Sequence, residues 1–214
     1  MTYIVLDGVE SAGKTTQVAL LADNFRRDNY EVLLVKEPGS DDPLCRQIRS
    51  LLLNSTVSIT PTASLCLFLA DRCQNMLAIK EALAAGKVVI SDRSSFSSFV
   101  YYAASMPEED PIEIASQISP LLDFAQQIKP DWCFVCSADF DWCREQLGKR
   151  EKLDRIELLG EDFHKRTHKY FGQHFLKPLQ INMKNAPEKV WFCQPASSAT
   201  KEQIADEIYS KITG

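Results

Sequence analysis

The alternation of two kinds of hydrophobic segment is the feature that most restricts how this chain can fold. Five short apolar runs, rich in β-branched residues, are separated by longer segments whose apolar residues recur at helical spacing. The pattern predicts an α/β fold with a parallel sheet, because parallel strands need helical crossovers that cover both faces. The predicted strands are residues 3–6, 31–35, 87–90, 132–135 and 190–193, and the predicted helices are residues 14–27, 43–53, 61–85, 96–104, 112–127, 161–180 and 201–211.

Length and composition favour one globular domain. The chain has 214 residues, of which 45% are hydrophobic and 25% are charged, as in an ordinary folded protein. Because no stretch rich in glycine, serine and proline divides it, we expect a single domain over residues 1–214. Its most charged loop, residues 148–156, is a candidate lid and is called the lid segment below.

Charge and cysteine content indicate the class of partner and the compartment. With 24 Lys and Arg against 29 Asp and Glu, the net charge of −5 speaks against a nucleic-acid partner. No apolar run approaches the length of about 20 residues that spans a membrane, so we expect no membrane partner. The seven cysteines are an odd number placed in apolar runs, which suits reduced thiols in a cytoplasmic protein.

A phosphate-binding motif follows the first predicted strand. Residues 8–15 fit G-x-x-x-x-G-K-[ST], with a strand before and a helix after. Glycines let backbone N–H groups face a phosphate, Lys14 reaches the outer phosphates, and the Thr15 hydroxyl is placed to bind Mg²⁺. The motif therefore predicts ATP binding by Gly8, Val9, Glu10, Ser11, Ala12, Gly13, Lys14, Thr15 and Thr16.

Three further features suggest a second substrate. Asp92 and Arg93 end a predicted strand, where Asp92 could hold the metal and Arg93 could clamp a phosphate. Phe68 and Arg72 share a helix face and could stack on a base and donate to its carbonyl oxygen. Arg150 in the lid segment could close over the transferring phosphate. Each feature also has a purely structural interpretation: a helix cap, a core aromatic residue beside a solvated arginine, and a salt-bridged loop.

The order of these motifs resembles the thymidylate kinase family over nearly the whole chain. The matching pieces are residues 6–16 (LDGVESAGKTT), 36–39 (KEPG), 48–53 (IRSLLL), 67–72 (LFLADR), 90–93 (ISDR) and 153–157 (LDRIE). The resemblance implies a P-loop NTPase fold with three α/β/α layers, transfer of a phosphoryl group from ATP to dTMP, Mg²⁺ dependence and a homodimer. It is closest to the bacterial variety, in which the lid supplies an arginine that the P-loop lacks.

The resemblance also implies roles for particular residues. Arg49 and Arg93 would hold the dTMP phosphate, Glu10 would lie near the sugar and phosphate, and Tyr101 would crowd the 2′ position. The implied catalytic residues are Glu10, Lys14, Arg93, Arg150 and Arg155. The implied acceptor-binding residues are Glu37, Pro38, Arg49, Phe68, Arg72, Arg93, Ser97, Ser98, Tyr101 and Tyr102.

The chain departs from the family pattern at three positions. It has Lys36 where arginine is usual, Ser94 where a large residue is usual, and Tyr102 where bacterial members often have glutamine. The last departure leaves open a kinase for another deoxynucleotide, such as the 5-modified hydroxymethyl-dUMP. An ATPase or nucleotide-sensing module on the same P-loop is the alternative from a different functional class.

Overall fold

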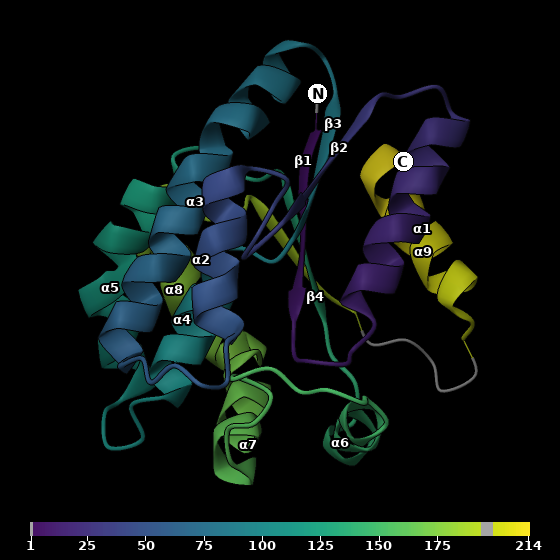
Figure 1. Cartoon of the computed structure of the whole chain (residues 1–214). Helices are drawn as coiled ribbons and strands as arrows, with labels where there is room; N and C mark the ends of the chain where they lie inside the picture. Colours follow the sequence, from purple (N-terminus) through teal and green to yellow (C-terminus); the bar gives the residue numbers. More distant parts are fainter. Residues whose placement is uncertain (1, 194–198) are drawn as a thin grey trace.

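A parallel sheet is the centre of the structure, a computed structural model that describes residues 2–193 and 199–214. Within those residues the sheet has five strands in the order β2-β3-β1-β4-β5, and every neighbouring pair is parallel (Figure 1). The predicted α/β fold class is therefore confirmed. The strands are β1 (Thr2–Gly8), β2 (Val32–Lys36), β3 (Val88–Asp92), β4 (Trp132–Cys136) and β5 (Lys189–Cys193).

Helices cover both faces of the sheet, which explains why the strands are nearly continuous apolar runs. The first helix, α1 (Lys14–Arg27), packs with the last, α9 (Lys201–Thr213), over one face, and most of the others cover the opposite face (Figure 1). Alternate β1 residues enter the two cores: Ile4 and Leu6 on the α1 side, and Tyr3 and Val5 on the other. The remaining helices are α2 (Pro43–Leu53), α3 (Pro61–Ala84), α4 (Ser95–Ala104), α5 (Pro111–Gln126), α6 (Phe140–Gly148), α7 (Glu161–Tyr170) and α8 (Gln173–Asn182).

One helical prediction needs correction, and one helix was missed. The helix predicted over 161–180 is two helices, α7 and α8, which meet at Gly172. A Cβ atom at Gly172 would lie 2.9 Å from the carbonyl oxygen of Lys169, so the glycine allows the chain to turn closely there. Helix α6 was not predicted, because only Cys143 and Leu147 bury their side chains and the apolar pattern is too short to detect.

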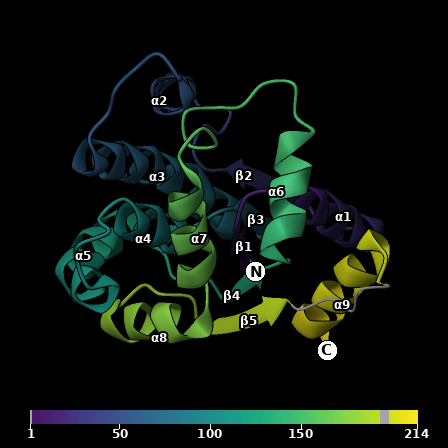
Figure 2. The same ribbon diagram turned by 90° about the horizontal axis from the view of Figure 1, so that it is seen from below.

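The carboxyl ends of the strands lie together at one end of the molecule, which Figure 2 views directly. Because β2, β3 and β1 are neighbours in the sheet, the segments that follow them meet at that end. The connection from α6 to α7, which contains the lid segment, passes over this end toward α2 (Figure 2). It is attached there by a hydrogen bond from the N–H of Arg155 to the carbonyl oxygen of Leu53, 3.1 Å long.

Among the described residues, none of the helices combines the length and apolar character that crossing a membrane requires.

Candidate active site

The P-loop between β1 and α1 is shaped by backbone conformations that favour small residues. Gly8 has φ 129°, and a Cβ atom there would lie 1.9 Å from the carbonyl oxygen of Cys136 on the neighbouring strand. Ser11 (φ 61°) and Gly13 (φ 84°) are also left-handed, so the chain turns back before α1 begins at Lys14. The motif therefore forms the strand–turn–helix that its spacing predicts.

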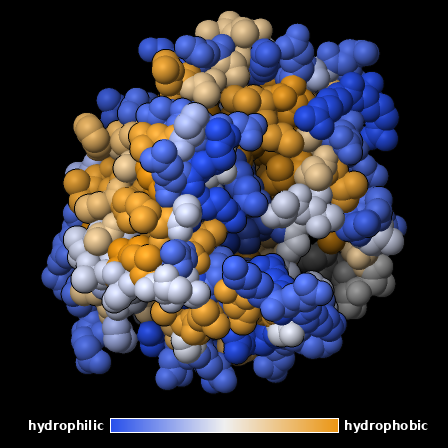
Figure 3. Space-filling view, in the orientation of Figure 1, coloured by the Kyte–Doolittle hydropathy of each residue, from blue (hydrophilic) through white to orange (hydrophobic). Residues whose placement is uncertain are grey.

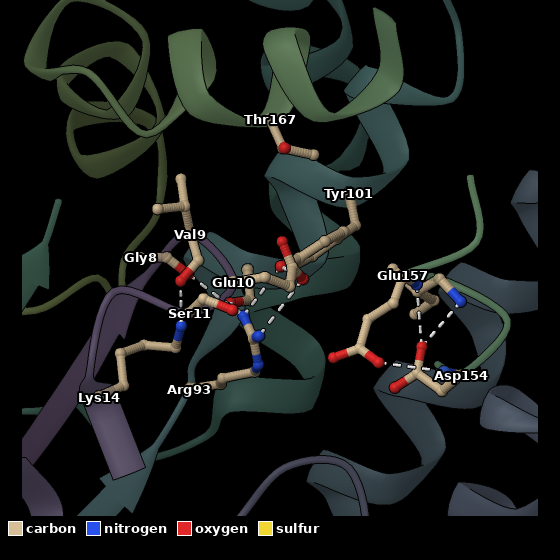
Figure 4. Close-up of polar contacts among 12 residues, drawn as sticks. Gly8, Val9, Glu10, Ser11, Lys14, Arg93, Tyr101, Asp154, Glu157 and Thr167 are labelled. Atoms are coloured by element: carbon tan, nitrogen blue, oxygen red, sulfur yellow. Dashed lines mark hydrogen bonds and ion pairs between the residues drawn. The ribbon is translucent and has the colours of Figure 1, made fainter. Parts of the chain in front are cut away.

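Lys14 and Thr15 begin α1 and lie at the carboxyl ends of the strands. The Lys14 ammonium is buried and donates to the carbonyl oxygen of Val9 (Figure 4). Burial and the nearby Arg93 lower the pKa of Lys14 to about 8, although Glu10 and Asp92 oppose the shift. The Thr15 hydroxyl donates to Oδ2 of Asp92 over 2.8 Å, so α1 and β3 together present two oxygen ligands.

Arg93, directly after β3, is held in an unusual conformation. Its φ of 89° is costly for a residue with a side chain, by about 1–3 kcal/mol, and such residues concentrate at functional sites. Its N–H donates to the carbonyl oxygen of Leu6 at 2.9 Å, and the Ser91 hydroxyl donates to its carbonyl oxygen at 2.9 Å. These contacts with β1 and β3 fix the backbone from which the guanidinium extends.

The Arg93 guanidinium is the centre of a polar cluster (Figure 4). Nη1 donates to the Ser97 hydroxyl at 3.0 Å and the Tyr101 hydroxyl at 3.1 Å, and Nη2 lies 3.5 Å from Oε1 of Glu10. The Tyr101 hydroxyl also donates to Glu10. Burial alone would raise the pKa of Glu10, but Arg93 and Lys14 lower it below its ordinary value, so the carboxylate is charged.

A buried ion pair lies on the other side of the cleft, where Glu37 follows β2. Arg72 of α3 donates to Oε2 of Glu37 through Nε (2.9 Å) and Nη2 (2.6 Å), and through Nη1 to the Ser98 hydroxyl (3.0 Å). Both charged side chains are almost fully buried. Burial raises the pKa of Glu37 to about 7, although Arg72 opposes the shift.

Arg49 lies beside this pair because Gly39 leaves room for it. A Cβ atom at Gly39 would be 2.4 Å from Cδ of Arg49. The Arg49 Nη1 donates to the carbonyl oxygen of Pro38 at 2.7 Å, and the Gly39 N–H donates to Oδ1 of Asp71 at 2.9 Å. The KEPG motif therefore holds two arginines, one from α2 and one from α3.

The lid segment brings a cation over the P-loop. Arg150 pairs with Glu157, and its Nη2 donates to the Ser11 hydroxyl at 3.3 Å. Glu157 is held by the Asp154 N–H, and the Asp154 carboxylate accepts the N–H groups of Ile156 and Glu157 at 2.9 and 3.0 Å (Figure 4). The turn at the end of the lid segment thus fixes the carboxylate that orients Arg150.

One cavity of about 480 Å³ joins these groups. The predicted residues that line it are Glu10, Ser11, Gly13, Lys14, Thr15, Thr16, Glu37, Pro38, Arg49, Phe68, Arg72, Asp92, Arg93, Ser97, Ser98, Tyr101 and Arg150. The sequence analysis missed others that line it: Lys36, Leu53, Trp142, Gln146, Asp154, Ile156 and Glu157. Trp142 and Gln146 come from the unpredicted helix α6, whose capping residue Asp139 was the available signal, since it accepts the Trp142 N–H at 3.0 Å.

Five predicted residues do not line this cavity. Gly8, Val9 and Ala12 belong to the P-loop but are not among the lining residues, and Val9 lines a smaller cavity beside α6 and α7. Arg155 and Tyr102 instead line a second cavity of about 340 Å³ between α3, α4 and α7. Arg155 donates through Nε to the carbonyl oxygen of Leu52 (2.7 Å) and through Nη2 to the Ser64 hydroxyl (2.9 Å), so it is not brought to the P-loop.

Comparison with known proteins identifies the family. Residues 6–192 match the family model described as thymidylate kinase. Curated thymidylate kinases similar to this chain include one from Halothermothrix orenii, 29% identical over 216 residues, which cover 99% of this chain and 96% of that protein. Another, from Protochlamydia amoebophila, is 33% identical over 217 residues (95% and 94%), and one from Clavibacter sepedonicus is 34% identical over 172 residues (79% of each). The chain therefore belongs to the thymidylate kinase family.

Proposed function

We propose that this protein transfers the γ-phosphoryl group of ATP to the phosphate of dTMP, yielding ADP and dTDP. The observation that carries the proposal is that one cavity joins the P-loop to Arg93, Phe68 and Arg72, in a chain of the thymidylate kinase family. An ATPase module would need only the P-loop. Family membership does not favour hydroxymethyl-dUMP or another deoxynucleotide as the acceptor. Tyr102, the residue that suggested such an acceptor, lies outside this cavity.

The end of the cavity that contains Lys14, Thr15, Asp92 and Arg93 is called the phosphate end below. It supplies charge and positions the reacting groups. Both reacting groups are phosphates and the acceptor phosphate is anionic at neutral pH, so the reaction needs no strong base. Lys14 would bind the outer phosphates of ATP, Arg93 and Arg49 would bind the dTMP phosphate, and Arg150 would neutralise the charge that develops between them. Glu10, bound to both Arg93 and Tyr101, would orient the two groups nearest the acceptor.

The Thr15–Asp92 pair suits Mg²⁺. Threonine and carboxylate oxygens are hard ligands, and Mg²⁺ is commonly held by one or two protein oxygens together with phosphate oxygens and water. No group of three or more His, Cys, Asp or Glu side chains that could hold a metal alone occurs among the described residues, which agrees with such an arrangement. When bound, the ion would neutralise the phosphates, while Thr15 and Asp92 would fix its place beside Lys14.

The end of the cavity that contains Glu37, Phe68 and Arg72 is called the base end below. It is suited to a neutral ring. A guanidinium has five N–H donors, and Arg72 uses three of them on Glu37 and Ser98. Two remain for a carbonyl oxygen of thymine, while Glu37 neutralises the charge that would otherwise attract a phosphate. Phe68, one helical turn away on α3, would stack on the base.

The remaining expectations stay part of this proposal. The chain would act as a single domain whose lid segment closes by bringing Arg150 to ATP, while Arg155 anchors the lid to α2 and α3.

A homodimer is supported by an apolar patch on the packed helices α3 and α5, where Leu77, Leu121 and Phe124 are 64%, 51% and 75% exposed. Figure 3 shows hydrophobic residues gathered on this side of the molecule. The seven cysteines are free thiols, five of them buried, which supports a cytoplasmic location.

The acceptor screen tests the proposed function. Diphosphate formation from ATP should be fastest, by kcat/KM, with dTMP among dTMP, dUMP, hydroxymethyl-dUMP, dCMP and dGMP. A higher value with another nucleotide would assign that acceptor instead. ATP hydrolysis that no monophosphate changes, with no diphosphate product, would favour the ATPase module.

A further inference from the structure

Asp7, the residue before the P-loop, has a buried carboxylate that does not line the cavity. The side chain is fully buried, and it accepts four hydrogen bonds. Oδ1 accepts from the Gly8 N–H (3.0 Å) and the Ser97 hydroxyl, and Oδ2 accepts from the Ser94 hydroxyl (2.6 Å) and the Ser97 N–H (3.3 Å). One carboxylate on β1 therefore ties the start of the P-loop to the first turn of α4.

The contact with Ser97 links Asp7 to Arg93. A hydroxyl has a single proton, and a charged carboxylate can only accept, so the Ser97 proton must point toward Asp7. The lone pairs of Ser97 are then directed away from Asp7, where Oγ accepts from Nη1 of Arg93 at 3.0 Å. Asp7 thus determines the direction in which Ser97 can accept a hydrogen bond from the guanidinium.

The contact with Ser94 holds the backbone next to Arg93. Ser94 caps α4, since its Oγ accepts the Phe96 N–H at 3.1 Å while its proton goes to Asp7. Arg93 itself has φ 89°, a conformation that persists only where its neighbours are fixed. The small residue at position 94, one of the three departures from the family pattern, is thereby used in this chain as a second attachment to Asp7.

We propose that Asp7 is a positioning residue for phosphoryl transfer, which fixes the Arg93 guanidinium through Ser97 and the Arg93 backbone through Ser94. This inference rests on the proposed function, in which Arg93 binds the acceptor phosphate. Ser97, which the family resemblance placed against the nucleoside, acts here as the link between Asp7 and Arg93.

Asp7→Asn is a sharp probe, because an amide cannot replace this carboxylate. The two oxygens each accept one backbone N–H, from Gly8 and from Ser97, and a backbone N–H cannot reverse its direction. An asparagine amide would therefore face one of them with its own NH₂ group. We expect kcat/KM for dTMP to fall about 30-fold in Asp7→Asn, about tenfold in Ser97→Ala and about threefold in Ser94→Ala.

Ser95→Ala is the matched control. Ser95 lies in the same turn of α4 and is equally buried, but its hydroxyl has no hydrogen-bond partner. We expect its kcat/KM to stay within about twofold of the wild-type value. A thermal melt of each variant would show whether a loss of activity follows a loss of folded protein.

A double-mutant cycle separates positioning from a general structural role and from direct substrate contact. We expect Ser97→Ala and Asp7→Asn each to cost less than about twofold when Arg93→Ala is already present, because the group that they position is gone. Equal losses with and without Arg93 would overturn the proposal, and so would a loss in Ser95→Ala as large as that in Ser97→Ala. If Asp7→Asn fails to fold, the Ser97→Ala cycle decides alone. A wild-type protein without dTMP kinase activity would instead contradict the proposed function.

Discussion

At the phosphate end of the cavity Arg93 lies 3.5 Å from Glu10 with 19% of its side chain exposed, whereas at the base end Arg72 lies 2.6 Å from Glu37 with 2% exposed. A second cation, Lys14, lies near Arg93, and the charge of Arg93 adds to burial in lowering the Lys14 pKa. The ion pair at the phosphate end is thus looser and partly open to the cavity, while at the base end a close, buried carboxylate neutralises the arginine. The same residue type can therefore attract a phosphate at one end and donate to a neutral ring at the other.

Removing the lysine at the phosphate end should have the largest effect. We expect Lys14→Ala to lower kcat by about 10³-fold, because no other described side chain takes the same place at the start of α1. Steady-state kinetics would measure it, with Lys87→Ala as the control, since Lys87 is exposed and pairs with Glu31 far from the cavity. Near-normal turnover of Lys14→Ala would remove this lysine from its role.

The lid cation should have the next largest effect. We expect Arg150→Ala to lower kcat by about 10²-fold with little change in thermal midpoint, because its side chain is 46% exposed. The adjacent Lys149, which pairs with Glu145 at 2.7 Å, is the matched control, and Lys149→Ala should keep most of the activity. Equal losses in the two variants would mean that the lid acts by its overall charge rather than through Arg150.

Breaking the ion pair at the base end tests the other side of the comparison. Glu37→Gln leaves a buried arginine without its counter-charge, so we expect the free energy of unfolding to fall by about 3 kcal/mol. KM for dTMP should rise about tenfold while KM for ATP changes little, because Arg72 is at the base end. Urea denaturation and two-substrate kinetics would measure both, and Glu31→Gln, at an exposed pair, should leave both unchanged. A larger rise in KM for ATP than for dTMP would contradict the division between the two ends.

The pH profile should show the smallest effect. The Lys14 pKa is lowered to about 8 in the free protein, and only the protonated ammonium attracts phosphates. We therefore expect kcat/KM for ATP to fall about fivefold between about pH 8 and about pH 9. Lys14→Arg should remove this fall, since a guanidinium stays charged. The same fall in Lys14→Arg would assign the titration to another group.

The sequence predicts some site residues better than others for a local reason. The P-loop lies between a strand and a helix that follow one another directly, so nearest-neighbour geometry places Lys14 and Thr15. Asp92 and Arg93 follow β3, and the rule that parallel strands end at one edge places them beside the P-loop. Residues 194–198 lie outside the described residues, and no prediction of a site residue falls on them.

The lid segment shows where such reasoning stops. Arg150 and Arg155 belong to one charged run, yet Arg150 reaches the P-loop while Arg155 donates to α2 and α3. Their directions depend on the turn around Asp154 and on the packing of α7, which no local pattern reveals. Glu157 and Trp142 were missed for the same reason: the first is placed by that turn and the second by a helix with only two buried residues.

By itself the sequence determined the strand–helix alternation, the phosphate-binding loop and the set of charged residues after the strands, because these depend on neighbours along the chain. Tertiary structure alone decided which cations form a close, buried ion pair and which stay open to the cavity. It pairs Arg72 with Glu37 across 35 positions, joins Asp7 to Ser97 across 90, and turns Arg155 away from the cavity that Arg150 enters. Ionic and hydrogen-bonding contacts act over a few ångströms, and only the packing of helices on the sheet brings such distant residues within that range.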